Sequence, residues 1–342
     1  MSHHPVDPEL ARAASALPRI DRTDVAEARR ILANRIVASG RYDATDDGVT
    51  IEDHTCTAVD GHLIALRVYR PHHRTNMGAI HHVHGGGFIM GDLEMSHLRN
   101  VEIAREIGSI VVSVDYRLAP EWPFPTPVED VYSSLVWLHD RSDELGIDPS
   151  LIALHGVSAG GCLVASTALL ARDRNGPPIC FQFLASPVLD DRLESESSRR
   201  FTDSPALNRH DAETCWSAYL GSIKRETSAV PQYAAPARVP DLTRLPRTYV
   251  SVAELDPLRD DGIDYARALL VAGVPVELHL FPGTYHGSSA VQGAEVSRRE
   301  RSEEISVLRR VMSGGYAVST SDLKQKTPYT PPHDVEGDPS HV

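Results

Sequence analysis

The sequence predicts an α/β protein whose central sheet is largely parallel and doubly wound, with helices on both faces. Short apolar segments rich in β-branched residues alternate with longer segments of helical periodicity over most of the 342 residues. The segment 110–114 is almost continuously apolar, as expected for a parallel strand that is buried on both faces. A charged stretch rich in Ser and Pro at 190–241 interrupts the alternation and is predicted to be an insertion.

Two amphipathic helices are expected before the first strand, over about 10–17 and 24–39, with Pro18 and Gly40 at their ends. Strands and helices then alternate, and the insertion should contain a helix at about 211–220. The expected strands are 62–69, 79–83, 110–114, 151–154, 179–184, 247–252 and 276–281. The remaining expected helices are 94–107, 127–138, 163–171, 262–272 and 295–312.

Composition and charge narrow the range of partners. The formal net charge is −13, from 47 acidic and 34 basic residues, and a surface of that sign repels the phosphates of nucleic acids and anionic lipids. No apolar run approaches the roughly 20 residues that span a bilayer, and the N-terminus has no secretory-signal pattern. The four cysteines show no metal-binding spacing and should be reduced and mostly buried. We therefore expect a cytoplasmic protein without a metal ion or other cofactor.

A Gly-x-Ser-x-Gly motif at 156–160 stands between a predicted strand and a predicted helix. In that setting the chain must turn sharply and hold the serine in a strained conformation at the tip of the turn. The glycines two residues to either side of the serine remove Cβ atoms that would collide where the strand and helix pack closely. Ser158 is therefore predicted to be a nucleophile beside a helix N-terminus, where developing negative charge is stabilised.

Three consecutive glycines follow the predicted strand at 79–83, in the run His-Gly-Gly-Gly-Phe at 84–88. Such a backbone can approach a ligand closely and turn its N–H groups toward it. The N–H groups of Gly86, Gly87 and Ala159 could form an oxyanion hole, in which one donor is typically worth about 3–4 kcal/mol. A flexible turn or a phosphate cradle is the alternative, but the sequence lacks the usual phosphate-binding glycine patterns here.

A hydrolytic serine needs a histidine as base and an acid that orients the histidine. In enzymes with this serine turn the chain order is serine, acid, histidine. Asp256 and His286 follow two successive predicted strands, so both should lie at the carboxyl edge of the sheet. His286 would take the proton of Ser158, and Asp256 would fix the tautomer of His286. Three other acids are candidates for the orienting role: Glu254, which could still lie in the strand, and Asp260 and Asp261, which could begin the next helix.

Taken together, these motifs resemble those of the bacterial hormone-sensitive-lipase-type esterases, a group with the α/β-hydrolase fold. The resemblance extends over about residues 50–315 and includes the run Asp-Tyr-Arg-Leu-Ala-Pro-Glu at 115–121. The run Phe-Pro-Gly-Thr-Tyr-His-Gly-Ser at 281–288 is similar to the heroin (acetylmorphine) esterase branch. Val157 departs from the pattern, because Asp or Thr usually precedes the nucleophile in this group.

The resemblance implies a catalytic core, residues 46–189 and 242–315, beneath a helical cap formed by residues 1–45 and 190–241. The polar, Pro-containing residues 316–342 are expected to be disordered. The resemblance further implies the triad and oxyanion hole already named, with the 115–121 run as structural support beside them. Four aromatic residues could line the substrate pocket or simply pack the cap on the core: Phe88, Trp122, Trp216 and Tyr219.

The activity implied is that of a serine carboxylesterase acting on small-molecule esters with short acyl chains, through an acyl-enzyme. The same triad could instead act on amide, carbamate or lactone bonds. A non-catalytic ligand receptor on the same fold is the alternative from another class of function. Members of the group are often dimers, so a homodimer is the expected assembly if the chain associates.

Overall fold

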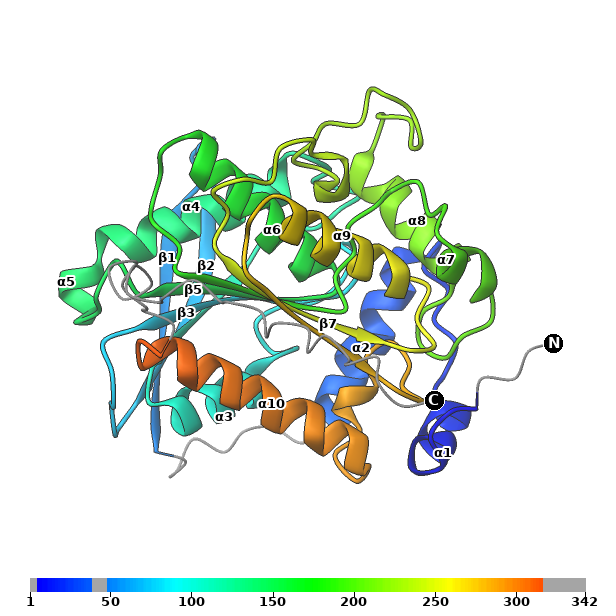
Figure 1. Ribbon diagram of the computed structural model, residues 1–342, viewed down its shortest axis with the longest axis horizontal. Coiled ribbons are helices and arrows are strands. Elements are labelled where there is room, and N and C mark those ends of the chain that lie inside the picture. The colour runs from blue at the N-terminus through cyan, green and yellow to red at the C-terminus, as the bar shows by residue number, and fades with distance from the viewer. Residues whose placement is uncertain (1–4, 39–47, 316–342) are drawn as a thin grey trace, which may run out of the picture.

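The computed structural model describes residues 5–38 and 48–315, and its centre is one eight-stranded sheet (Figure 1). The strands are β1 (Val49–Thr57), β2 (Leu63–Pro71), β3 (Ala79–Val83), β4 (Ile110–Asp115), β5 (Ile152–Val157), β6 (Phe181–Ala185), β7 (Arg247–Ala253) and β8 (Val276–Phe281). They lie in the order β1-β2-β4-β3-β5-β6-β7-β8. β2 is antiparallel to β1 and β4, and every other pair is parallel. The predicted α/β fold with a mostly parallel sheet is confirmed.

The helices cover both faces of this sheet. They are α1 (Pro8–Ala16), α2 (Val25–Ala38), α3 (His97–Ile107), α4 (Thr126–Asp140), α5 (Ser142–Leu145), α6 (Ala159–Asp173), α7 (Glu196–Arg200), α8 (Arg209–Leu220), α9 (Arg259–Val271) and α10 (Glu295–Met312). In Figure 1, α4, α6 and α9 lie above the sheet, and α3 and α10 lie below it. Two buried clusters match this arrangement, one shared by the sheet with α4, α6 and α9, and one shared with α3 and α10.

The central strands are apolar because both of their faces are covered. All five residues of β3 are buried, and so are the first five of β4. His81 and His82 of β3 are buried as well, and each finds a polar partner on a neighbouring element. His81 Nε2 lies 2.8 Å from Ser134 Oγ, and His82 Nδ1 lies 2.8 Å from Nδ1 of His155 on β5. These histidines are therefore buried core residues, each with one ring nitrogen in a polar contact.

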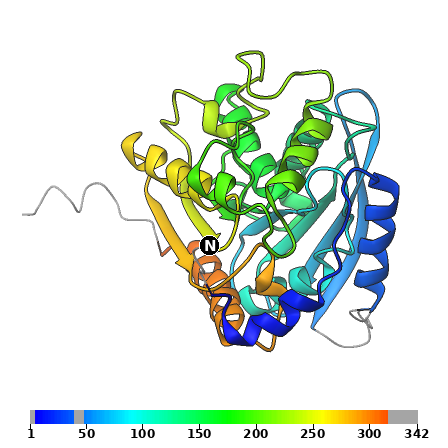
Figure 2. The ribbon, with the colours of Figure 1, turned by 90° about the vertical axis from the view of Figure 1, so that its right-hand side faces the viewer.

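The two N-terminal helices pack against segments that follow strands at the carboxyl edge of the sheet. In Figure 2, α1 runs along the lower edge of the molecule and α2 along its right-hand edge. Leu10 of α1 is buried in one cluster with Tyr285, and Ala28 of α2 is buried in another with Ile89 and Cys215. The segment between β6 and β7 contains α7, α8 and a single 3-10 turn. The division of the chain into core and cap stays a prediction.

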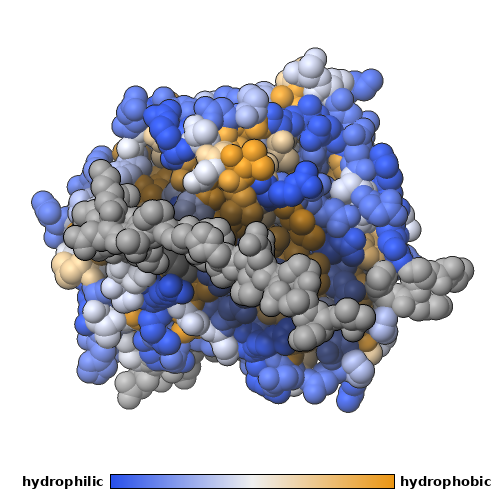
Figure 3. Space-filling model, in the orientation of Figure 1, coloured by the Kyte–Doolittle hydropathy of each residue, from blue (hydrophilic) through white to orange (hydrophobic). Residues whose placement is uncertain are grey.

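The surface is mainly hydrophilic at the periphery of the face seen in Figure 3, with apolar residues gathered near its centre. β8 crosses this central region in Figure 1, and its Leu278 and Leu280 are 40% and 44% exposed. No helix within residues 5–38 and 48–315 is long and apolar enough to cross a membrane. All four cysteines are free, and three of them are buried. The tail predicted at 316–342 lies outside the described residues.

Candidate active site

Ser158 stands at the tip of the turn between β5 and α6. Its φ and ψ angles are 57° and −118°, a conformation that residues with a side chain rarely adopt. The N–H of Ser158 donates to the carbonyl of Ala185 at 2.8 Å, and its carbonyl accepts from the N–H groups of Gly161 and Val188 at 2.9 and 3.1 Å. The strained backbone is thus held by hydrogen bonds from its own helix and from the segment that follows β6.

The glycines on either side of Ser158 are required by backbone contacts. A Cβ atom at Gly156 would lie 2.3 Å from the carbonyl oxygen of Gly160. A Cβ atom at Gly160 would lie 2.1 Å from the carbonyl oxygen of Val83, at the end of β3. Neither neighbour is the movable end of a side chain, so any larger residue would push the turn away from the sheet.

The three residues of the predicted triad are joined in series, with His286 between Ser158 and Asp256, as the sequence predicts. His286 Nε2 is 2.9 Å from Ser158 Oγ, and His286 Nδ1 is 2.6 Å from Asp256 Oδ2. The other oxygen of Asp256 accepts the N–H of Leu258 at 2.9 Å, and the Asp256 residue is 1% exposed. A buried carboxylate therefore faces one nitrogen of the imidazole while the other nitrogen faces the serine, as base catalysis requires.

The alternative acids have other partners. Glu254 accepts the N–H of Gly283 at 2.7 Å, which ties the loop after β7 to the loop before His286. Asp260 accepts the N–H of Ser197 at 2.7 Å. Asp261 is buried in the first turn of α9, where burial raises its pKa to about 7. Asp256 is thus the acid that meets His286.

The glycine run after β3 supplies two N–H donors near Ser158, and the first residue of α6 supplies a third. Gly86 and Gly87 have φ angles of 106° and 63°. A Cβ atom would lie 1.9 Å from the carbonyl oxygen of Met90 at the first and 2.4 Å from Cys215 Sγ at the second. Over residues 5–38 and 48–315, the N–H groups of Gly86, Gly87 and Ala159 have no hydrogen-bond acceptor. Such donors are available to an oxyanion.

The segment around Tyr116 holds this glycine run in place. The Tyr116 hydroxyl donates to the His84 carbonyl at 3.0 Å, and the two rings stack with centroids 4.3 Å apart. Burial lowers the pKa of His84 to about 4, so this ring is neutral at pH 7. Further along, the N–H of Ala119 donates to the Phe88 carbonyl at 2.9 Å. The 115–121 run contacts the glycine loop rather than the reacting side chains.

A cavity of about 470 Å³ opens over Ser158 and His286. Its walls come largely from residues 5–38 and 190–241, here called the outer segments. The outer segments contribute mainly apolar side chains: Ala13, Leu17, Pro18, Ile20, Leu32, Ile36, Ala206, Leu207, Ala212 and Cys215. Both segments predicted to form a cap therefore line the same cavity.

None of the four aromatic residues considered for the pocket lines this cavity. Phe88, Trp216 and Tyr219 are fully buried, and the rings of Phe88 and Tyr219 stack with centroids 4.0 Å apart. Trp122 is 44% exposed beneath the Arg117 guanidinium. Ala212 and Cys215 present one side of α8 to the cavity, whereas Trp216 and Tyr219 pack into the core. The structure places none of the four in this cavity. The packing alternative describes Phe88, Trp216 and Tyr219, and Trp122 lies at the surface.

The residues that do line the cavity carry little sequence signal. Ala206, Leu207 and Ala212 are small or aliphatic and lie in the segment with the weakest periodicity. Tyr285 lies directly before His286, and it too lines the cavity. Its position directly before His286, the predicted base, is the one indication that the sequence offers.

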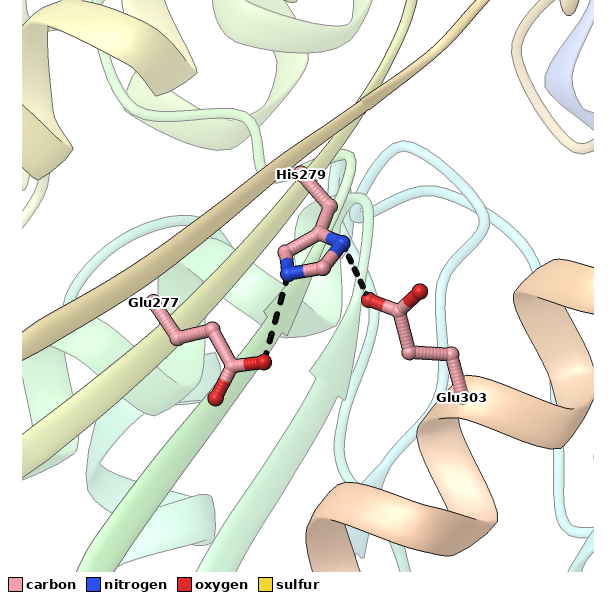
Figure 4. Close-up of side chains that lie close together, drawn as sticks. All are labelled: Glu277, His279 and Glu303. Carbon is pink, nitrogen blue, oxygen red and sulfur yellow. Dashed lines mark ion pairs between the residues drawn. The ribbon is translucent and has the colours of Figure 1, made fainter.

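One group of side chains of the metal-binding type lies away from the cavity, where β8 faces α10 (Figure 4). His279 stands between two carboxylates, with Nδ1 2.5 Å from Glu303 Oε1 and Nε2 3.2 Å from Glu277 Oε1. The Tyr249 hydroxyl also donates to Glu303, at 2.7 Å. Because both ring nitrogens already face carboxylates, the arrangement is that of an ion-paired histidine tying β8 to α10.

The chain is similar to a known family and to several proteins of known structure. Residues 80–289 match the family model described as the alpha/beta hydrolase fold. A bacterial heroin esterase of known structure is 47% identical and superposes with a TM-score of 0.87. The superposition covers 90% of this chain and 98% of the heroin esterase chain. The esterase LipW of Mycobacterium marinum is 33% identical, with 90% and 96% covered and a TM-score of 0.82. The carboxylesterase NlhH of Mycobacterium tuberculosis is 42% identical over 230 residues, which are 66% of this chain and 70% of that protein.

The chain therefore belongs to the α/β-hydrolase family. Within that family it falls in the hormone-sensitive-lipase-type esterases, the group that its motifs predict. The resemblance to the heroin esterase branch is confirmed by the likeness to the bacterial heroin esterase.

Proposed function

We propose that this protein is a serine carboxylesterase that hydrolyses short-chain acyl esters through an acyl-enzyme. Its class, a carboxylic ester hydrolase, follows from the relatives, which are named esterases and carboxylesterases. The single observation that carries the mechanism is the hydrogen-bonded series from Ser158 Oγ through His286 to Asp256 at one end of an apolar cavity.

In the first half of the reaction, Ser158 Oγ attacks the ester carbonyl while His286 Nε2 accepts the serine proton. Asp256, which faces Nδ1, stabilises the imidazolium that forms. The three unoccupied N–H donors at Gly86, Gly87 and Ala159 then stabilise the oxyanion of the tetrahedral intermediate. His286 returns the proton to the departing alcohol, which leaves Ser158 acylated.

In the second half, a water molecule takes the place of the alcohol. His286 Nε2 accepts a proton from this water, and the resulting hydroxide attacks the acyl carbonyl. The same N–H donors hold the second oxyanion, and collapse of that intermediate releases the acid and restores Ser158. One base thus serves both halves, because Asp256 keeps Nδ1 protonated throughout.

The size of the cavity supports short acyl chains. Its volume of about 470 Å³ lies toward the lower end of the range for small-molecule pockets and suits a small ester better than a triglyceride. A relative of similar length supports this size class: the ethyl acetate hydrolase of Pseudomonas putida is 31% identical, with 81% of this chain and 87% of that protein covered.

The proposal is tested with p-nitrophenyl acetate and the variant Ser158→Ala. We expect kcat to fall by about 10⁴-fold or more, because the nucleophile is lost while the fold is kept. Ser302→Ala is a matched control, since Ser302 is exposed on α10, and its kcat should equal that of the wild type. Full activity in Ser158→Ala would refute the mechanism. A panel of matched ester, amide and lactone substrates then decides which acyl bond is preferred.

A further inference from the structure

The cavity over Ser158 is apolar except at a few positions. Apart from Ser158 and His286, the charged or hydroxyl-bearing side chains among its lining residues are Arg22, Arg35 and Tyr285. No Asp or Glu belongs to the lining. A substrate inside this cavity therefore meets hydrogen-bond donors and positive charge, with no carboxylate to balance them.

Arg22 is already neutralised. Its Nη1 lies 2.7 Å from Asp211 Oδ1, and its Nη2 donates to the carbonyl of Ala206 at 2.8 Å. The Arg22 side chain is 10% exposed, so this pair joins the N-terminal outer segment to α8 at a nearly buried site. Arg22 thus has a structural partner and contributes little free charge to the cavity.

Tyr285 has a hydroxyl without a partner. The residue is 2% exposed, and over residues 5–38 and 48–315 its buried oxygen has no hydrogen bond. A buried hydroxyl normally finds an acceptor or a donor, because leaving it unpaired costs free energy. Tyr219 and Tyr265 also have unpaired buried hydroxyls, but neither lines the cavity. Tyr285 differs because it lines the cavity over Ser158.

Arg35 is the second free donor. It lies in the last turn of α2, is exposed, and makes no ion pair or hydrogen bond within the described part of the chain. Arg29 and Arg30 on the same helix are paired with Glu121 and Glu27. Burial raises the pKa of Tyr285, and the Arg35 charge opposes that rise. Arg35 and Tyr285 line the same cavity.

We propose that the substrate carries a carboxylate on its acyl or alcohol portion and that Tyr285 and Arg35 bind it. An ionised carboxylate only accepts hydrogen bonds. It therefore matches a site whose free polar groups, a hydroxyl and a guanidinium, can both donate. A half-ester of a short dicarboxylic acid is the simplest member of this class. This inference rests on the proposed esterase function and specifies its substrate.

The test uses esters matched in length and different in charge. On the acyl side, monomethyl glutarate is compared with methyl pentanoate and with the methyl ester of 4-(trimethylammonio)butyrate. On the alcohol side, 3-acetoxypropanoate is compared with propyl acetate. The wild type should hydrolyse the anionic ester with a kcat/KM about tenfold or more above its neutral match in at least one series, and the cationic ester should be the poorest.

Two variants assign the preference to residues. Tyr285→Phe should lower the ratio of anionic to neutral kcat/KM by about tenfold, through KM more than kcat, because the contact lies away from the reacting carbonyl. Arg35→Gln should lower the same ratio by about two- to fivefold. Because Arg35 is exposed, about 1 M salt should screen its charge and abolish the difference between Arg35→Gln and the wild type. Tyr265→Phe and Arg30→Gln are the controls, and neither should change the ratio, because neither residue lines the cavity.

The outcomes separate this inference from the function on which it rests. An unchanged ratio in both Tyr285→Phe and Arg35→Gln, or equal rates on the anionic and neutral esters in both series, would overturn the carboxylate site and leave the esterase proposal standing. Failure of the wild type to hydrolyse any of these esters would overturn the esterase proposal itself.

Discussion

The sheet edge that carries the triad and the outer segments that close the cavity are held in place by different means. The loops bearing Asp256 and His286 are joined by backbone hydrogen bonds, from Glu254 N–H to the Phe281 carbonyl at 3.2 Å and from Leu255 N–H to the Thr284 carbonyl at 2.9 Å. The outer segments rely more on side chains, such as the ion pairs Arg22–Asp211 and Arg29–Glu121.

The difference indicates that chemistry and substrate choice are separable in this molecule. Backbone contacts at the sheet edge cannot be altered by most substitutions, so the reacting groups keep their geometry. The cavity walls depend on side-chain pairs and on small apolar residues, which can change without moving Ser158. Substitutions at the sheet edge should therefore act on kcat, and substitutions in the outer segments should act on KM and stability.

The largest effect is expected at the sheet edge, from Asp256→Asn. The amide cannot stabilise the imidazolium or enforce the tautomer of His286, so kcat should fall by about 10⁴-fold with little change in stability. Steady-state kinetics on p-nitrophenyl acetate measure this. Glu254→Gln is the matched control, because Glu254 contacts Gly283 instead of His286. A greater loss of kcat in Glu254→Gln than in Asp256→Asn would reverse the assignment of the acid.

The second effect is expected in the glycine run at 85–87. Comparison with a glycine elsewhere distinguishes the loss of oxyanion donors from the general cost of a side chain at positive φ. A Cβ atom at Gly86 would meet the Met90 carbonyl, whereas one at Gly273, which also has a positive φ, would meet nothing within 4 Å. Gly86→Ala should lower kcat by about 10²–10³-fold because the N–H donors shift. Gly273→Ala should cost about 1 kcal/mol of stability and leave kcat unchanged. Equal kcat values in the two folded variants would contradict the oxyanion role of this loop.

The third effect is a pH dependence at the junction between α9 and the 190–241 segment, where Asp261 is buried. Burial raises the pKa of Asp261 to about 7, so the folded protein keeps a proton that the unfolded chain loses near pH 4. Between these values the folded state binds more protons, and the free energy of unfolding falls as pH rises. Asp261→Asn cannot lose a proton, so its stability relative to the wild type should improve by about 2–4 kcal/mol from pH 4.5 to pH 8. Urea unfolding at several pH values measures this, and a constant difference would count against it.

The smallest effect is expected in the outer segments. Arg22→Met leaves Asp211 without its ion pair, which should cost about 2 kcal/mol of unfolding free energy. Because Arg22 joins the two outer segments, KM for short esters should rise more than kcat falls. Arg30→Gln removes an exposed pair on α2 and should leave the urea midpoint of unfolding close to that of the wild type. A loss of kcat in Arg22→Met with unchanged KM would show that the outer segments also set the chemistry.

The sheet and the triad could be predicted because their signals are local. A buried parallel strand is a continuous apolar run, and the residue after it must lie at the carboxyl edge of the sheet. This logic located Ser158, Asp256 and His286 from strand positions alone. It failed for β1, an edge strand whose central residues Glu52, Asp53 and His54 are polar and partly exposed. Its nine-residue pairing with β2 stabilises it instead.

The cavity could not be predicted because its walls are assembled from distant segments. The sequence predicts aromatic residues there, yet Trp216, directly after the cavity-lining Cys215, and Tyr219, one turn further along α8, are buried in the core. The partners of buried polar side chains could not be predicted either. Nδ1 of His155 faces His82 on the neighbouring strand, and its Nε2 lies 2.8 Å from Glu304 Oε1 on α10. Contacts of this kind depend on tertiary packing, which periodicity does not encode.

The central claim is that Ser158 is the nucleophile that His286 activates. Labelling the wild-type protein with a fluorophosphonate and mapping the adduct by mass spectrometry tests it most directly. We expect one label per chain on Ser158, formed in step with the loss of esterase activity and absent from His286→Ala. A label on a different residue, or loss of activity with Ser158 unmodified, would contradict it.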